Sequence, residues 1–152
     1  MQEPKIRQAD PAEPAVRALL VDVLGELSER YGGTGDDTPI GDTDFTPPGG
    51  AFFVADDGER LVGCAGWRRH GDDAELKRMF TAKAVRGQGV GRRLLATVER
   101  SARESGCRRV ILETGDKQPE AVGLYESAGY TRIPDFGYYR GHSGVLSYGK
   151  VL

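Results

Sequence analysis

Apolar residues recur along the chain with two different spacings, and these spacings predict alternating helices and strands. Over Ala15–Tyr31 they recur about every 3.6 residues, which predicts an amphipathic helix that ends at Gly32–Gly33. Asp10–Pro11 has the form of an N-cap followed by proline at the first helical position. A second stripe predicts a helix over about Gly89–Ser105, and a third helix is expected over Pro119–Ala128.

Runs of β-forming residues bounded by turn residues predict the strands. The expected strands are Lys5–Arg7, Ala51–Ala55, Arg60–Arg69, Ala74–Phe80, Arg109–Glu113, Tyr130–Ile133 and Val145–Val151. Residues 34–50 are rich in Gly, Pro, Asp and Thr and predict a long loop, a feature that is often functional in a compact domain. No repeat or linker divides the sequence. We therefore expect one domain over residues 1–152, of the α/β class with a mixed sheet.

The composition is that of an ordinary soluble domain. The chain has 152 residues, of which 38% are hydrophobic and 29% charged, enough to form a core. No apolar run is long enough to span a membrane, and the N-terminal residues lack the apolar centre of a signal peptide, so a cytoplasmic location is expected. Cys64 and Cys107 lack metal-ligand spacing; we expect reduced thiols in or near the core, and no metal.

Charge is distributed unevenly, although the net charge is only −2. Between Tyr31 and Glu59 there is no Lys or Arg, and the acidic residues are Asp36, Asp37, Asp42, Asp44, Asp56, Asp57 and Glu59. Residues 85–110 reverse this balance, with Arg86, Arg92, Arg93, Arg100, Arg103, Arg108 and Arg109. The segments are either solvated faces, or a basic end for a polyphosphate and an acidic mouth for a cation. Because the basic residues are confined to one helical region, no nucleic-acid partner is expected.

The stretch most informative about function lies where the Ala74–Phe80 strand leads into the next helix. Its sequence is Arg86-Gly87-Gln88-Gly89-Val90-Gly91. Glycines let backbone N–H groups approach a ligand closely, and the first turn of a helix adds unpaired donors and a positive dipole end. These features suit a phosphate or pyrophosphate. The spacing fits neither a Walker loop nor a dinucleotide fingerprint, and an ordinary strand-to-helix turn is the alternative.

Arg-x-x-Gly-x-Gly at such a junction resembles the coenzyme A pyrophosphate loop of the GNAT superfamily of N-acetyltransferases. A second block, Leu112–Gly115 followed by Gln118–Tyr130, is similar to the GNAT segment that ends in Leu-Tyr-x-x-x-Gly-Phe/Tyr. The resemblance covers nearly the whole chain from about residue 10 and is strongest to small bacterial members. It implies the GNAT fold, a mixed central β-sheet of about six to seven strands flanked by about four helices.

The resemblance also implies acetyl transfer from acetyl-coenzyme A, as cosubstrate, to a primary amine. The pyrophosphate is expected on the glycine turn and the pantetheine amides along the strand edge before it. A backbone N–H near Met79 or Phe80 is the candidate donor to the oxyanion. The expected cofactor-binding residues are Met79, Phe80, Thr81, Arg86, Gly87, Gln88, Gly89, Val90, Gly91, Arg92 and Gln118. Gln118 stands where many GNAT proteins carry an asparagine.

Two residues are the expected catalytic groups. Tyr125 matches the tyrosine that often protonates the leaving thiolate in the superfamily, whereas a tyrosine at helical spacing is otherwise a core residue. Glu75, on the strand leading to the coenzyme site, is the candidate general base, because a primary amine with a pKa near 10.4 arrives protonated. The alternatives are a glutamate paired with Lys77 or Arg68, and a water relay without a single base.

The acceptor pocket is expected at the end of the first helix. Glu29 and Tyr31 stand where small GNAT enzymes often line this pocket, unless they form an exposed helix end, and Phe45 and Tyr138 are expected to wall it. The acidic 36–44 loop favours a small cationic amine. Acetylation of a protein lysine or N-terminus, and a non-catalytic acyl-coenzyme A binding module, are the alternatives. Val145–Val151 either pairs across a homodimer or closes the sheet of a monomer.

Overall fold

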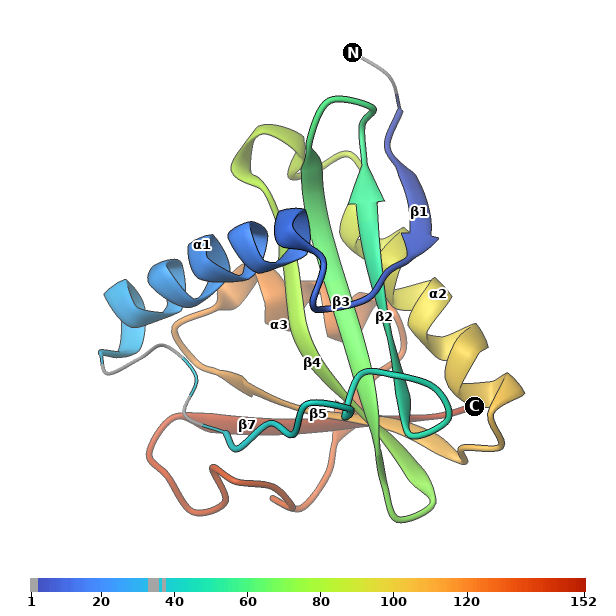
Figure 1. Cartoon of the computed structure of the whole chain (residues 1–152). Coiled ribbons are helices and arrows are strands. Elements are labelled where there is room, and N and C mark those ends of the chain that lie inside the picture. Colours follow the sequence, from blue (N-terminus) through green and yellow to red (C-terminus); the bar gives the residue numbers. More distant parts are fainter. Residues whose placement is uncertain (1–2, 33–35, 37) are drawn as a thin grey trace.

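Seven strands form one mixed sheet with helices on both faces (Figure 1), in a computed structural model that describes residues 3–32, 36 and 38–152. The strands are β1 (Lys5–Gln8), β2 (Gly50–Asp56), β3 (Leu61–His70), β4 (Asp73–Thr81), β5 (Arg109–Gly115), β6 (Thr131–Arg132) and β7 (Val145–Val151). Their order is β1-β2-β3-β4-β5-β7-β6. All neighbours are antiparallel except the parallel pair β4 and β5, so the predicted mixed sheet is confirmed.

Four helical segments accompany the sheet in the described part of the chain. They are the helices α1 (Pro14–Tyr31), α2 (Val90–Glu104) and α3 (Pro119–Ser127), and the 3-10 helix η1 (Lys83–Val85). The prediction that α1 starts at Asp10–Pro11 was wrong, because Asp10 instead closes a turn with Ala12 and Glu13. A helix begun at Pro11 would require an N–H that Pro14 lacks, whereas Pro14 fits the first helical position.

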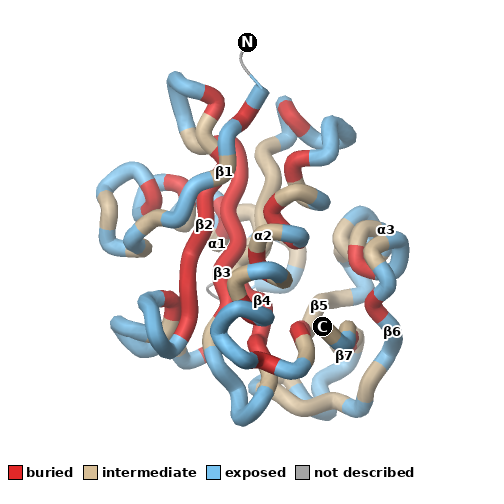
Figure 2. Tube along the Cα trace, turned by 90° about the vertical axis from the view of Figure 1, so that its right-hand side faces the viewer, coloured by how far each residue is buried: buried red, intermediate tan, exposed pale blue. Residues whose placement is uncertain are grey.

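The helices divide the core into two clusters on opposite faces of the sheet. Phe52 packs on the α1 side with Val16 and Val23, and the next residue, Phe53, packs on the α2 side in the larger cluster with Leu95. This alternation is the period-2 pattern of a strand covered on both faces. The central strands β2 and β3 are accordingly buried along most of their length (Figure 2). Both cysteines are free and buried, as predicted.

The parallel strands β4 and β5 part soon after they meet. Only Ala74 with Val110, and Glu75 with Ile111, are paired between them. Beyond these pairs β4 continues steeply, while β5 and β7 run across it (Figure 1). The sheet is therefore open over the carboxyl halves of the two strands, where open α/β sheets bind their ligands.

Strand β7 lies inside the sheet rather than at its edge. It pairs with β5 along its whole length, from Val145 to Val151, and with the short β6 through Tyr148 and Gly149. Of the two predicted roles for this segment, closing the sheet of one chain is the one that this pairing supports.

Two valines on helices provide a test of the core assignment. Val98 on α2 is fully buried, whereas Val21 on α1 is 70% exposed. Val98→Ala is expected to lower the free energy of unfolding by about 2 kcal/mol, because it removes buried methyl groups and leaves a cavity. Val21→Ala should change it by less than about 0.5 kcal/mol. Urea unfolding of both variants checks this, and equal losses would contradict the assignment of the α2 face to the core.

Candidate active site

A cavity of about 930 Å³ occupies the opening between β4 and β5. Its walls come from the C-terminal part of α1, the second half of β4, the glycine turn, the end of β5, the start of α3 and the loop before β7. The volume is in the range of small-molecule and cofactor sites. Most of the residues that the sequence nominated line this one cavity: Met79, Phe80, Thr81, Arg86, Gly87, Gly89, Val90, Gly91, Arg92, Gln118, Tyr125, Tyr31 and Tyr138.

The glycine turn has the predicted shape of an anion site. Gly87 and Gly89 have φ angles of 81° and 82°, in the left-handed region that favours glycine. Gly89 is the N-cap of α2, and its carbonyl accepts the first helical hydrogen bond, from the N–H of Arg93. A side chain on Gly91 would press on Leu124 and Thr81. The backbone thus brings the first N–H groups of α2 to the cavity, at the positive end of the helix dipole.

The cations around this turn are held by protein acceptors. Arg86 donates to the carbonyl of Thr81 at 3.0 Å and to the carboxylate of Glu26 on α1 at 2.9 Å. Arg92 lines the cavity mouth and donates to the hydroxyl of Ser127. Gln88 turns back to a backbone carbonyl of η1 and does not line the cavity. Arg86 thus ties the turn to β4 and α1, and Arg92 ties the start of α2 to α3.

A β-bulge shapes the β4 wall of the cavity. Between the pairs Cys64–Phe80 and Gly66–Lys77, two β4 residues, Arg78 and Met79, stand opposite one β3 residue. Arg78 has a φ of 60°, a left-handed conformation rare outside glycine. The Cys64 thiol lies 3.1 Å from the Arg78 carbonyl and donates to it, and burial raises the pKa of this thiol to about 12. The bulge therefore breaks the regular pairing of β4 at the predicted oxyanion position.

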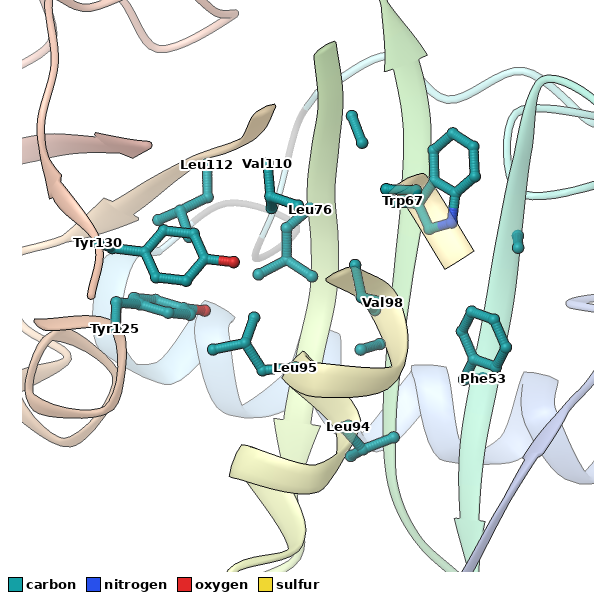
Figure 3. Close-up of a cluster of buried hydrophobic side chains, with 14 of the residues drawn as sticks. Phe53, Trp67, Leu76, Leu94, Leu95, Val98, Val110, Leu112, Tyr125 and Tyr130 are labelled. Carbon is teal, nitrogen blue, oxygen red and sulfur yellow. The ribbon is translucent and has the colours of Figure 1, made fainter. Parts of the chain in front are cut away.

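Tyr125 reaches the cavity from α3. Its side chain is 5% exposed, and its ring lies 5.9 Å from the ring of Tyr130, beside Leu95 and Leu112 (Figure 3). Its hydroxyl makes no hydrogen bond to any described residue, while that of Tyr130 donates to Glu99. Burial raises the pKa of the Tyr125 phenol, so at neutral pH the group carries a proton that it can donate.

Besides Gln88, three nominated residues do not line this cavity. Glu75 is 2% exposed and paired with Arg68 at 2.9 Å, which is one of the two partners that the sequence suggested. Phe45 is 6% exposed and packs against Phe52 in the α1-side core. Glu29 lies on the other side of α1, in a separate surface groove. The physical reason is common to all three, because a pattern of residue types does not fix which way a side chain points.

Tyr31 and Tyr138, which the sequence nominated for an acceptor pocket, both line the cavity. Tyr31 packs directly onto Gly115, where any side chain would overlap its hydroxyl, and Lys117 lies over its ring. Through this contact, the end of α1 packs against the end of β5. Tyr138 is half-exposed and meets the ring of Tyr139 edge-on. The part of the cavity beside the end of β5 is therefore walled by aromatic rings and covered by α1.

The acidic loop has a different role from the one expected of it. Asp36 is the acidic loop residue that lines the cavity, and it already pairs with Lys77 and Arg78. These contacts hold the pKa of Asp36 well below its usual range. Asp44 pairs with Arg68 instead, and Asp37 lies outside the described residues. Within the described chain, the loop supplies a counter-ion to the protein's own cations rather than a free acidic mouth.

Glu113 is the functional candidate that sequence reasoning missed. It lies on β5 two residues after Ile111, at the level where β4 and β5 part, and it lines the cavity. The backbone N–H of Tyr139 donates to its Oε2 at 3.0 Å, but its buried Oε1 has no hydrogen bond within the described residues. Burial raises the pKa of this carboxyl. A charged residue directly after the apolar run 110–112 was the available sequence signal.

The opened parallel strand pair, the bulged strand and the glycine turn at the start of α2 together define the fold and site of an acyl-coenzyme A N-acyltransferase. Residues 20–130 match the acetyltransferase (GNAT) family. The chain belongs to this family, and the resemblance predicted from its motifs is confirmed. No helix among the described residues is long and apolar enough to cross a membrane.

Named relatives support this assignment. The chain is 32% identical to an IAA acetyltransferase of Azospirillum brasilense over 88% of both chains. An acetyltransferase from Streptococcus agalactiae superposes with a TM-score of 0.78, at 26% identity over the whole of both chains. An aminoglycoside 6′-N-acetyltransferase in complex with coenzyme A shares the fold, with a TM-score of 0.75 at 18% identity, over 97% of this chain and 96% of that one. The chain is accordingly a GNAT acetyltransferase.

Two glycines near the cavity test the strained turn. A Cβ at Gly89 or at Gly123 would meet no atom within 4 Å, but Gly89 has a positive φ whereas Gly123 lies inside α3. Gly89→Ala is therefore expected to lower the free energy of unfolding by about 1–2 kcal/mol. Gly123→Ala should raise it by about 0.5–1 kcal/mol. Chemical denaturation measures both changes, and a harmless Gly89→Ala would mean that the turn does not depend on its left-handed backbone.

Proposed function

We propose that this acetyltransferase moves the acetyl group of acetyl-coenzyme A to a small cationic primary amine. The observation that carries the proposal is the continuity of the cavity, which runs from the glycine turn, past the bulge of β4 and Tyr125, to Glu113. The proposed anion site is at one end, and the Glu113 carboxyl, whose Oε1 has no hydrogen bond within the described residues, is at the other. A thioester held between them would meet the amine where β4 and β5 part.

The donor half of the site fits coenzyme A through backbone groups. The N–H groups of Gly87, Gly89 and Gly91 and their neighbours would hold the pyrophosphate at the start of α2. The β4 edge at Met79–Thr81, which has left β5, would pair with the pantetheine amides as an added strand. Gln118, at the N-cap of α3, lines the same cavity and takes the place of the family's asparagine.

The reacting carbonyl would lie between the bulge and Tyr125. Attack by the amine turns the carbonyl oxygen into an oxyanion, and a backbone N–H at Met79 or Phe80 is the donor we assign to it. Tyr125 then gives its proton to the departing thiolate. This role agrees with its burial and its raised pKa, because the phenol keeps its proton until a strong base forms beside it.

The covered acceptor end favours a small molecule over a protein substrate. Tyr31 rests on Gly115, and this contact closes the groove along which an extended peptide would lie. The aromatic rings and the carboxyl at this end are groups that bind a cation. Acetylation of a protein N-terminus or lysine is the second candidate, and it requires α1 to lift from β5.

Thermal stabilisation by ligands tests the donor assignment. Acetyl-coenzyme A at 100 times its dissociation constant should add about 2.7 kcal/mol to the free energy of unfolding. Free coenzyme A should also stabilise the protein. ATP and NAD should not, because the glycine turn matches neither the Walker loop nor the dinucleotide fingerprint. Melting temperatures recorded side by side check this. Stabilisation by ATP or NAD alone would contradict the coenzyme A site.

Tyr125→Phe tests whether Tyr125 acts as a proton donor or only packs in the core. The variant keeps the ring and its packing against Tyr130, so acetyl-coenzyme A should stabilise it as much as it stabilises the parent protein. Its turnover should fall by about 10²-fold or more, because the thiolate loses its acid. Release of free thiol measures turnover, with Tyr148→Phe, which removes a hydroxyl outside the cavity lining, as the matched control. Unchanged turnover in Tyr125→Phe would remove its assigned role.

A further inference from the structure

A cluster of charged side chains lies where β4 meets the loops that follow α1 and precede β7. In the described part of the chain, its carboxylates outnumber its cations by one. The carboxylates are Asp36, Asp44, Glu75 and Glu113. The cations are Arg68, Lys77 and Arg78. The cluster is therefore neutral when one carboxyl carries a proton, or when one further cation enters.

Three of the four carboxylates are matched by the protein's own cations. Arg68 bridges Asp44 and Glu75, with both contacts at 2.9 Å. Asp36 receives Lys77 at 2.9 Å and Arg78 at 3.0 Å. The hydroxyls of Thr38 and Tyr139 also donate to Asp36, which completes its coordination.

Glu113 is the carboxylate of this cluster that forms no ion pair with any described residue. Its Oε2 accepts the backbone N–H of Tyr139, but its Oε1 is buried with no partner among the described residues. Gly137 lies directly against this oxygen, at a position where any side chain would overlap it. The structure thus keeps one carboxylate oxygen buried, unpaired and beside the cavity, although an unsatisfied buried acceptor is costly.

From this arrangement we infer that Glu113 is the acceptor-binding and proton-accepting carboxylate, and that the missing cation of the cluster is the ammonium group of the substrate. The inference rests on the proposed function and names the residue that selects its substrate. It assigns to Glu113 the base role that the sequence suggested for Glu75, which is buried against Arg68 and turned from the cavity.

The proton balance of the reaction follows from this placement. The ammonium donates to Oε1, transfers one proton to Glu113 and becomes a neutral amine, which forms the new N–C bond with the thioester carbon. Collapse of the tetrahedral intermediate breaks the C–S bond, and the thiolate takes the proton of Tyr125. The amide nitrogen loses its second proton, which restores Tyr125, and Glu113 releases its proton to solvent. One proton is produced for each acetyl group transferred.

The groups that face Glu113 make its ionisation depend on such a cation. Glu75 and Asp36 are negative and disfavour a third negative charge, while Lys77, which favours it, is already bound to Asp36. Tyr139 contributes its backbone N–H, and His142 lies edge-on to the Tyr139 ring, 5.6 Å between centroids. Burial is the main cause that raises the pKa of Glu113; Glu75 and Asp36 add to it, while the Tyr139 N–H and Lys77 act against it. An incoming ammonium reverses the balance and stabilises the ionised carboxylate.

The pH dependence of stability in Glu113→Gln and Glu75→Gln shows which of the two glutamates has the raised pKa, and this measurement needs no acceptor substrate. A carboxyl with a raised pKa holds its proton in the folded state after the unfolded chain has lost it. The free energy of unfolding therefore falls as pH rises from the ordinary glutamate range through the raised value. Glu113→Gln removes this fall, so its stability relative to the parent protein should increase over that pH range. Glu75→Gln, which breaks an ion pair, should lose stability and keep the fall.

Methylammonium, the smallest primary ammonium, tests the cation site directly. Its chloride should raise the melting temperature of the complex with coenzyme A, whereas sodium chloride at equal ionic strength should not. The dissociation constant of methylammonium should rise at least tenfold in Glu113→Gln. In the surface control Glu104→Gln this constant should be unchanged. Once a screen for thiol release has found an acceptor, kcat/KM for that acceptor should be about 10²-fold lower or more in Glu113→Gln. The part of the kcat/KM pH profile that reports the ionisation of Glu113 should also be lost in this variant.

The outcomes separate the two proposals. Stabilisation by coenzyme A without any effect of methylammonium, or an equal effect in Glu113→Gln, overturns the role of Glu113 and leaves the donor site intact. If the fall in the free energy of unfolding with rising pH disappears in Glu75→Gln rather than in Glu113→Gln, the general base is Glu75 and not Glu113. Failure of coenzyme A to bind removes the proposed function itself, which the melting temperature of the parent protein shows before any variant is made.

Discussion

The early separation of β4 from β5 is the constraint on which the rest of the structure depends. A fully paired parallel sheet would leave no space at this point, and two residue pairs are all that join the strands. The separation leaves the edge of β4 at Met79–Thr81 facing a cavity rather than a neighbouring strand. Because the backbone groups of this half-buried edge need hydrogen-bond partners, the opening would suit an extended chain of amides, as proposed for pantetheine.

Several local features keep the opening from closing. The bulge at Arg78 and Met79 turns β4 away from regular pairing, and Cys64 holds the carbonyl of the bulge from the neighbouring strand. On the α1 side, the carboxylate of Asp36 binds the side chains of two β4 residues. Separating Asp36 from these partners would cost several kcal/mol, because a largely buried charge would be left unpaired. Packing alone therefore does not decide the distance between β4 and β5.

The sequence determined the elements more fully than the site. Every predicted strand is present because alternating apolar residues and turn residues act locally, and the glycine turn was found because its glycines require a particular backbone. The start of α1 was missed because Pro14 overrides the signal at Asp10. Side-chain direction was harder still. Glu75 and Glu113 are both glutamates on buried strands, and only the tertiary placement of Arg68 shows which of them is already paired.

The two ends of the cavity are built from different kinds of group, and this difference has a consequence for specificity. At the glycine turn, Arg86 and Arg92 each donate to protein atoms, and the N–H groups at the start of α2 would bind a pyrophosphate. Such a site depends on glycine geometry and tolerates substitutions elsewhere. This tolerance suits an acetyl donor that is common to a whole family. At the other end, where we propose that the acceptor binds, the cavity is lined by Glu113, by Tyr31 at the end of α1 and by Tyr138 on the loop before β7. A few substitutions there would change the acceptor without disturbing the donor site, because loop side chains vary while the scaffold holds.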